Sequence, residues 1–451
     1  MHVLVRLPTV VVATLLALAV VAVYVAAVVR MSRGARWSLT AVCAVALALR
    51  LVWVGPPFQI FGPTAYPPGL NDLEPDLLSR SLRILRDQGP YGLFAGFGSG
   101  GPPSALLVVL FNALPYPWLG LRWACRLHTL VGGVLSCVGV YAVARRLRIG
   151  ERAALFAAFC VGVLPWSLLY GRTSQGGDIV WHETMALWVL AALVDGESVS
   201  LAEWCIGTVG LALLLYDYQC GRAVFWMAVP LTVLAPYPKQ RVLSFLLVVF
   251  ALALFVVPTL QSGMPGVTTW TGLPLHATTA TGPVRGTQPH EEATIPLADI
   301  PARTLRILSA FIAPTADNDW MTVATGAMHP LALLVAAVAG CALATWRQRL
   351  FVAIVFGVGL VPACIGFAYA STHRMLMAFI AIPLAAAFML EHLPPRAKWP
   401  VTVLLAAWTA FASVTFYFSD NFWTPRIMSC GGCYNIPKER AESWMREFPE
   451  R

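Results

Sequence analysis

Three carboxylates stand close together in the segment NDLEPDLLSRSLRIL, which covers residues 71–85: Asp72, Glu74 and Asp76. Arginines then follow at every third position. A carboxylate that has no paired cation can accept a proton from a hydroxyl nucleophile, which makes this cluster a candidate for a general base. Acidic residues are also common at helix N-termini, where the helix dipole favours negative charge, so an ordinary helix start is the alternative interpretation.

Further ionisable residues stand at the ends of apolar segments along the chain. They are Arg126 and His128, Arg172, Asp178, His182 and Glu183, Asp217 and Arg222, and His373 with Arg374. Ionisable groups at membrane depth are costly and usually mark function. Together these residues would frame a pocket in which arginines bind an anionic headgroup. For any single arginine, a side chain that only extends to the membrane interface is as good an interpretation as one that contacts substrate. The interpretation as a binding pocket therefore depends on all these residues lying on the same side of the membrane.

Other sequence motifs give little support to a different class of function. The tail sequence CGGC, residues 430–433, has no second cysteine pair nearby to complete the four ligands of a structural zinc site, so a local disulfide or two free thiols are the leading interpretations. The chain has no GxxxxGK[ST] phosphate loop and no GxSxG elbow, and DND at 317–319 is the nearest match to a DxD metal motif. An ATP-driven pump and a soluble type of nucleotide-sugar enzyme are therefore disfavoured.

Composition places the chain in a membrane. The 451 residues are 58% hydrophobic and only 12% charged, with a mean hydropathy of +0.71. A soluble domain carries about 25% charged residues, so this chain has too few to cover its surface in water. The net charge of +9 is spread over short basic clusters between apolar segments, without a basic arm, and no nucleic-acid partner is expected.

Twelve apolar segments are predicted to span the membrane, although several are shorter than the roughly 20 residues that a span usually needs. They lie near 8–29, 38–54, 122–144, 153–170, 183–195, 203–218, 222–236, 242–259, 329–346, 350–369, 375–392 and 399–418. The predicted fold is therefore an all-α, polytopic membrane protein. The first segment has its stronger positive flank on the C-terminal side and no clear cleavage site, so it is interpreted as a retained helix.

Basic loops predict the orientation. The loops RMSRGAR, RRLRIGER, YPKQR, RQR and PPRAK all fall on one side, which the positive-inside rule assigns to the cytoplasm, whereas the acidic loop near 195–203 gives no information. The other side then carries every candidate residue named above. The protein is expected in the plasma (inner) membrane with its site on the extracytoplasmic side.

Three regions are predicted. Residues 1–37 form an extra N-terminal helix and a cytoplasmic loop, residues 38–420 form the main membrane domain with external loops at 55–121 and 260–328, and residues 421–451 form a short external tail. Within the first external loop, Pro75 suits a first helical turn and Gly89-Pro90 ends the segment. Leucines then project to one side and Arg80, Arg83 and Arg86 to the other, which predicts an amphipathic helix lying on the membrane surface. Residues 102–117 are predicted to be re-entrant or to lie on the surface.

Several stretches resemble the glycosyltransferase C superfamily, specifically the branch of protein O-mannosyltransferases and bacterial aminoarabinose-lipid A transferases. ALALRLVWV followed by LEPDLLSRSLRIL is similar to the first helix of that family and to the acidic opening of its first external loop. RLHTLVGGVLSCVGVYAVARRL looks like the second helix, and LPWSLLYGR followed by HETMALWVLAAL resembles the third external turn. YDYQCGRAVFWMAVPL and HRMLMAFIAIP are similar to later helix starts that bear an arginine. The resemblance covers residues 42 to 420.

The resemblance implies an enzyme that takes a sugar from a polyprenyl-phosphate carrier and passes it, with inversion, to an acceptor glycan, lipid or protein outside the membrane. It implies that the donor phosphate is bound by Arg374 and Arg222, with His373, Arg126 and Arg172 as further candidates. It implies Glu74 or Asp72 as the base, with Glu183 and Asp178 as rivals. No metal or other cofactor is required, because arginines can balance the charge of the leaving group.

Two departures from the family pattern leave alternatives open. Leu73 precedes Glu74 where the family usually has Asp, and the insertion TSQGGDIVWH makes Asp178 a rival to Glu183. A non-catalytic member of the same fold is therefore an alternative. A transporter or lipid flippase is another, since twelve helices are common there, but the two halves are not similar. Arg50, expected near the middle of the second helix, is the ionisable residue that departs from the one-sided pattern.

Overall fold

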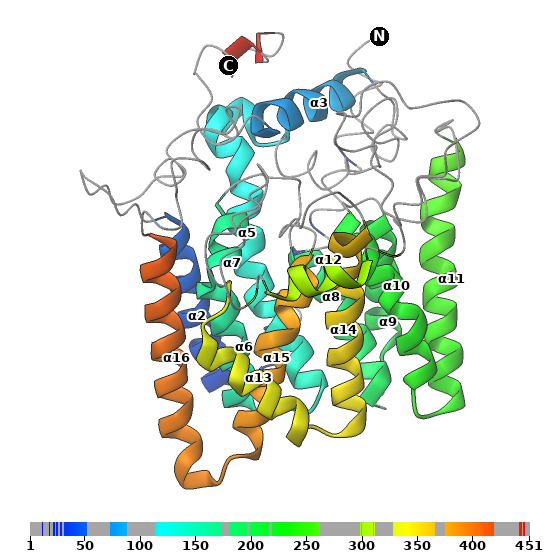
Figure 1. Cartoon of the computed structure of the whole chain (residues 1–451). Helices are drawn as coiled ribbons and strands as arrows, with labels where there is room; N and C mark the ends of the chain where they lie inside the picture. Colours follow the sequence, from blue (N-terminus) through cyan, green and yellow to red (C-terminus); the bar gives the residue numbers. More distant parts are fainter. Residues whose placement is uncertain are drawn as a thin grey trace.

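The computed structural model describes residues 31–51, 73–87, 113–172, 180–195, 199–215, 219–261, 300–309, 328–365 and 375–418, together with isolated positions between 11 and 28, at 298 and 311, and between 442 and 446 (Figure 1). The described elements are all α-helices. They are α2 (Arg33–Leu51), α3 (Leu73–Asp87), α5 (Tyr116–Arg146), α6 (Glu151–Val163), α7 (Pro165–Tyr170), α8 (Val180–Asp195), α9 (Leu201–Leu215), α10 (Gln219–Leu234), α11 (Pro238–Gln261), α12 (Ile300–Ser309), α13 (Leu331–Leu343), α14 (Trp346–Ile365), α15 (Leu376–His392) and α16 (Pro395–Tyr417).

The predicted apolar segments coincide with described helices. This holds for every segment from 38–54 onward, with shifts of several residues at some ends, and the described positions between 11 and 28 are helical too. Three described helices are long and apolar enough to cross a membrane: Arg33–Leu51, Trp123–Arg146 and Pro395–Tyr417. The all-α prediction is confirmed, while the number of twelve spans remains a prediction.

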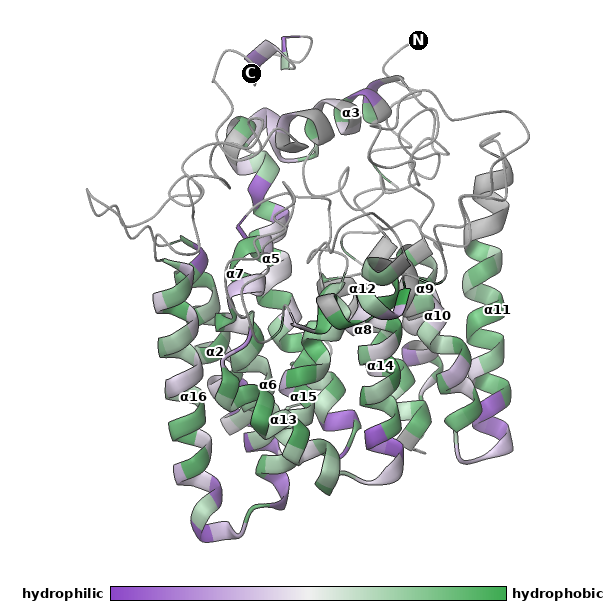
Figure 2. Cartoon of the chain, in the orientation of Figure 1, coloured by the Kyte–Doolittle hydropathy of each residue, from purple (hydrophilic) through white to green (hydrophobic). Residues whose placement is uncertain are grey.

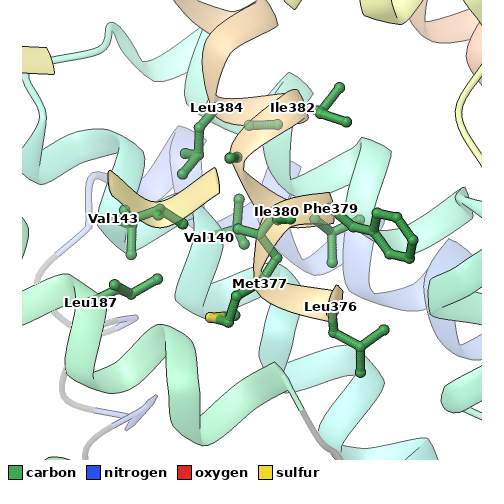
Figure 3. Packing of buried hydrophobic residues seen from close by; sticks show 14 of the residues in the cluster. Val140, Val143, Leu187, Leu376, Met377, Phe379, Ile380, Ile382 and Leu384 are labelled. Carbon is green, nitrogen blue, oxygen red and sulfur yellow. The ribbon is translucent and has the colours of Figure 1, made fainter. Parts of the chain in front are cut away.

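Helix α15 lies at the centre of the bundle (Figure 1). All its residues from Leu376 to Phe388 are buried, as expected for a helix that is apolar on every side. Side chains of α5 and α8 pack around it in the core (Figure 3). A Cβ added to Gly340 of α13 or Gly359 of α14 would collide with main-chain atoms of α15. Helices α13 and α14 therefore approach α15 closely enough for backbones to touch.

Helix α16 shows why the bundle suits a bilayer. Its outward face carries Leu404, Trp408 and Phe411, and each of these side chains is more than half exposed. Its buried residues are Thr402, Thr409, Ser413 and Tyr417. A helix at the surface of a soluble protein has the reverse arrangement. Most of the helical ribbon is also coloured hydrophobic in Figure 2, and these features indicate a multi-pass membrane protein.

The predicted cytoplasmic loops lie together at one end of the bundle, here called the inner end. Ser32 in the first loop donates a hydrogen bond to the Glu151 carboxylate in the second, at 3.4 Å. Glu391, beside the last loop, accepts a hydrogen bond from the backbone N–H of Gly150 at 2.9 Å. Gln348 also binds a carbonyl of the second loop, at 2.6 Å. The prediction that these loops share a side is confirmed, and Figure 2 shows hydrophilic segments gathered at that end.

Helix α3 lies across the opposite end, here called the outer end (Figure 1). It begins and ends within two residues of the predicted limits. Leu78 is buried and Leu82 and Leu85 pack against the core, whereas Arg83 is exposed. The predicted helix is therefore present with an apolar and a polar side, although Arg86 is partly buried, and its position on the membrane surface stays a prediction.

Three local features differ from the prediction. The segment 153–170 forms two helices, because Pro165 lacks an N–H and forces Leu164 into an extended conformation (φ −64°, ψ 144°). Helix α12 lies within 260–328, which was predicted to be a loop. Helix α5 begins at Tyr116, six residues before the predicted span, and bends at Gly120, whose φ of 72° favours glycine. Residues 102–112 lie outside the described residues.

Candidate functional site

Two of the nine predicted site residues have described side chains. They are Arg126 and Arg172, and both are buried. Glu74, Glu183 and Arg222 lie in the first turns of α3, α8 and α10, but their side chains are outside the described set. Asp72, Asp178, His373 and Arg374 lie outside the described residues.

The helix ends that carry or adjoin these residues meet at the outer end. Helices α5, α8, α10 and α15 begin there, and α2 and α7 end there. Helix α5 contacts α8, α8 contacts α10, α10 contacts α15, and α3 contacts α5. Segments that are far apart in the sequence therefore come together at one end of the bundle. Four helices also direct their N-termini, the positive ends of their dipoles, toward it.

Arg172, just after α7, is held by two other helices. Its side chain is buried, and Nη1 donates a hydrogen bond to the carbonyl oxygen of Leu49 in α2 at 3.3 Å. The guanidinium lies 5.6 Å from the ring centroid of Tyr417 and 5.4 Å from that of Phe418, at the end of α16. Nη2 has no hydrogen-bond partner among the described residues. The side chain is therefore fixed in place, with one terminal nitrogen that has no hydrogen-bond partner among the described residues.

The surroundings of Arg172 are positively charged. Burial lowers the pKa of the Arg172 guanidinium, the nearby Tyr417 raises it, and the positive charge of Arg126 lowers it. Tyr417 lies within electrostatic reach of both arginines and of Arg50 as well. Guanidinium groups stay protonated in proteins. Within the described part of the chain, no carboxylate forms an ion pair with Arg50 or Arg172, so this region suits an anion.

An aromatic cluster fixes α7 against α15. The ring centroids of Trp166 and Phe379 are 5.6 Å apart, and the His329 ring lies 5.2 Å from Phe379. Helix α7 leads to Arg172, and His373 and Arg374 precede the start of α15 directly. The cluster therefore fixes α7, which leads to Arg172, relative to the first turn of α15.

Sequence reasoning missed the partners of Arg172. Tyr417 and Phe418 lie far from it in the sequence, and no local pattern distinguishes them from other aromatic residues at a helix end. Arg50 was placed near the middle of its helix, but it lies in the last turn of α2, beside Leu49. Within the described ranges, no three His, Cys, Asp or Glu side chains are grouped to hold a metal ion. The prediction that no metal takes part remains untested.

The fold is similar to that of solved membrane enzymes. The Archaeoglobus fulgidus oligosaccharyltransferase in its apo form matches with a TM-score of 0.53 and 16% identity, over 92% of this chain and 58% of that one. The oligosaccharyltransferase AglB from the same organism, solved in complex with an inhibitory peptide and a dolichol-phosphate, matches with a TM-score of 0.53 and 13% identity over the same shares. The chain has a glycosyltransferase C type fold. Apo ArnT from Cupriavidus metallidurans matches with a TM-score of 0.49 and 16% identity, over 87% of this chain and 69% of that one.

The glycosyltransferase C fold confirms the family resemblance at the level of architecture. The chain spans 58% of the length of the oligosaccharyltransferase that it matches. No protein-family model matches the chain, and no curated protein sequence does. Likeness to this fold therefore comes from helix arrangement, and the chemistry has to be argued from the residues.

Proposed function

We propose that this protein is a membrane glycosyltransferase that takes a sugar from a polyprenyl-phosphate donor and transfers it to a hydroxyl group on the extracytoplasmic side. The observation that carries the proposal is Arg172, which is buried at the outer end of the bundle with Nη2 unpaired among the described residues and Arg126 nearby. Fixed guanidinium groups suit phosphate oxygens. The dolichol-phosphate bound by AglB, which shares this fold, supports the same class of ligand.

The reaction needs three groups in one place. The acceptor oxygen attacks the anomeric carbon of the sugar while a carboxylate takes the hydroxyl proton. The bond between this carbon and the phosphate oxygen breaks, and the electron pair leaves with the polyprenyl phosphate. Arginines stabilise the charge that develops on the phosphate. A single displacement of this kind inverts the anomeric configuration.

Helix α3 supports Glu74 as the carboxylate that acts as the base. The residue lies in the first turn of α3, and α3 contacts α5, the helix that carries Arg126. The first turn of a helix favours the ionised form of a carboxylate, which is the form a base needs. Glu183, in the first turn of α8, is the rival on a helix that also contacts α5.

The decisive test uses purified protein and radiolabelled polyprenyl-phosphate sugars. We expect the wild type to transfer sugar, and Glu74→Gln to lower the rate by roughly 10²- to 10⁴-fold, because the amide cannot accept the hydroxyl proton. Asp87→Asn changes a carboxylate at the other end of the same helix and serves as the matched control. It should keep wild-type activity.

The other carboxylates define the contradicting outcomes. If Glu74→Gln stays active while Asp72→Asn, Asp178→Asn or Glu183→Gln loses activity, the base is the residue changed in the inactive variant. A wild type that binds polyprenyl phosphate but never transfers a sugar would instead indicate a non-catalytic member of the fold. Arg50, the exception to the one-sided charge pattern, donates its hydrogen bonds to groups inside the bundle, so it gives the transporter alternative no support.

A further inference from the structure

Arg50 is fully buried and its hydrogen bonds all go to neutral acceptors. Nη1 donates to the carbonyl oxygen of Ala46 in its own helix at 2.8 Å and to that of Gly162 in α6 at 3.0 Å. Nη2 donates to the carbonyl oxygen of Ser167 in α7 at 3.1 Å and to its hydroxyl at 2.8 Å. One side chain therefore joins α2, α6 and α7, and both terminal nitrogens are occupied.

The bond to Gly162 compensates for the break between α6 and α7. In a continuous helix, the Gly162 carbonyl would accept the N–H of Trp166. The extended conformation of Leu164 before Pro165 interrupts that pattern, and the last bond across the end of α6 runs from the Leu164 N–H to Cys160. A buried carbonyl without a donor costs free energy. Arg50 supplies the missing donor.

Two glycines make room for this guanidinium. A Cβ on Gly133 of α5 would collide with Nε of Arg50, and so would a Cβ on Gly171 at the end of α7. The slot therefore admits the side chain only because both neighbours lack a Cβ. Its shape matches a planar, forked group that reaches two helices at once, which the single ammonium of lysine cannot imitate.

Hydrogen bonds connect the surroundings of Arg50 to Arg172. Arg50 binds Ser167 in α7, and Arg172, two residues beyond α7, donates back to Leu49, the residue before Arg50. The end of α2 and the end of α7 are thus tied by two arginines in opposite directions. We infer that Arg50 is a positioning residue, which bridges the break between α6 and α7 and so holds Arg172 where it binds the donor phosphate. This inference rests on the proposed function for its catalytic consequence.

A double-mutant cycle tests the inference by activity. We expect Arg50→Met to lower kcat/KM for the donor about as much as Arg172→Ala does, and the double variant to be no worse than either single variant, since both changes remove the same positioned group. Arg50→Lys should restore only part of the loss. If the fall in kcat/KM of the double variant equals the product of the two single falls, the inference would be overturned. Arg241→Met is the matched control, since Arg241 also binds a carbonyl at a helix end, at 2.9 Å, but near the inner end.

Amide hydrogen exchange tests the inference without requiring turnover. In the ligand-free protein, Arg50→Met should raise exchange across residues 162–172, while Arg241→Met should leave that segment unchanged. If residues 162–172 of Arg50→Met exchange as slowly as in the wild type, the inference is overturned. This result is informative even if the protein transfers no sugar and the proposed function fails. Should Arg50→Met not fold, Ser167→Ala removes one acceptor only and should give a smaller rise in the same segment. No rise in Ser167→Ala would then count against the inference.

Discussion

Buried guanidinium groups need acceptors, and Arg50 and Arg172 meet this need to different extents. Arg50 donates four hydrogen bonds to groups of the protein. Arg172 donates one, at 3.3 Å, and relies on the faces of Tyr417 and Phe418 for the rest of its contacts. Among the terminal nitrogens of these two arginines, only Nη2 of Arg172 has no hydrogen-bond partner among the described residues.

Replacing Arg172 should weaken the use of the donor. If Arg172 binds the donor phosphate as proposed, Arg172→Ala removes a charged hydrogen-bonding group, and kcat/KM for the sugar donor should fall roughly 10- to 100-fold. Steady-state kinetics with the radiolabelled donor measure the change. Arg349→Ala is the control, because Arg349 binds the carbonyls of Ala342 and Ala344 at 3.0 and 3.2 Å near the inner end. Equal losses in both variants would mean that the effect of Arg172 is general destabilisation.

Single residues could be predicted from the sequence only in part. Arg126 and Arg172 stand at the ends of apolar segments, and this position is visible in the sequence and agrees with their place in the structure. The contact between Arg172 and Tyr417 depends on how α7 and α16 pack, which no local pattern contains. Arg50 was expected to be unusual because it is charged inside an apolar segment, but its partners come from a helix break that the apolar pattern conceals.

Helices α13, α14 and α15 show how small residues determine packing between elements. Without a hydrophobic driving force in lipid, helices associate through close van der Waals contact, and glycine permits the closest approach. Gly340 and Gly359 lie against the backbone of α15 from two neighbouring helices. Helix α15 keeps its helical course through Pro383, inside this tightly packed environment.

Adding one methyl group should reveal this contact. Gly340→Ala places a Cβ against the Ala385 carbonyl oxygen, so α13 and α15 must separate, at a cost of about 1–3 kcal/mol. Thermal unfolding in detergent measures the lower midpoint. Gly357→Ala in α14 is the control, since nothing lies within 4 Å of a Cβ there, and it should keep or raise the midpoint. Equal midpoints for the two variants would contradict the packing described here.

Helices were predicted well where an apolar run ends in a charged or proline-containing loop, as at both ends of α16. They were predicted less well where the run continues through a break. Pro165 splits one run into α6 and α7, yet Pro230 and Pro383 lie inside α10 and α15 without dividing them. A proline in an apolar run therefore does not decide the outcome, because neighbouring helices can satisfy the freed backbone groups. Helix α12 was missed because its short amphipathic pattern lies within a long polar segment.

The distribution of charge distinguishes the two ends of the whole molecule. The five basic loops predicted to share a side do so, and the acidic loop that gave no information now has an explanation. Glu203 beside that loop forms an ion pair with Arg146, which stands in a basic loop. Its negative charge therefore belongs to the inner end and offsets a positive one there. The shared side of these loops could be predicted from the sequence because it depends on the order of apolar segments and basic loops, whereas the side that faces the cytoplasm stays a prediction.

Labelling with a membrane-impermeant thiol reagent tests this orientation in intact cells. A cysteine replacing Arg83, which is exposed on α3, should react from outside, whereas one replacing Arg349, exposed near the inner end, should react only after permeabilisation. The unmodified chain gives the background from its own cysteines. Labelling of both positions from the same side would refute the arrangement.

The hydroxyl groups on the bundle-facing side of α16 have a consequence for the environment that the protein needs. Contact with hydrocarbon is favourable for Leu404 and Phe411 and unfavourable for the hydroxyl groups of Thr409 and Ser413. The bilayer therefore favours a single orientation of this helix about its axis. Tyr417 shares the bundle-facing side, and its ring contacts Arg172. The surrounding lipid therefore helps to position Arg172. If Arg172 binds the donor phosphate as proposed, activity should be higher in a bilayer than in detergent micelles, which restrain the rotation of α16 less.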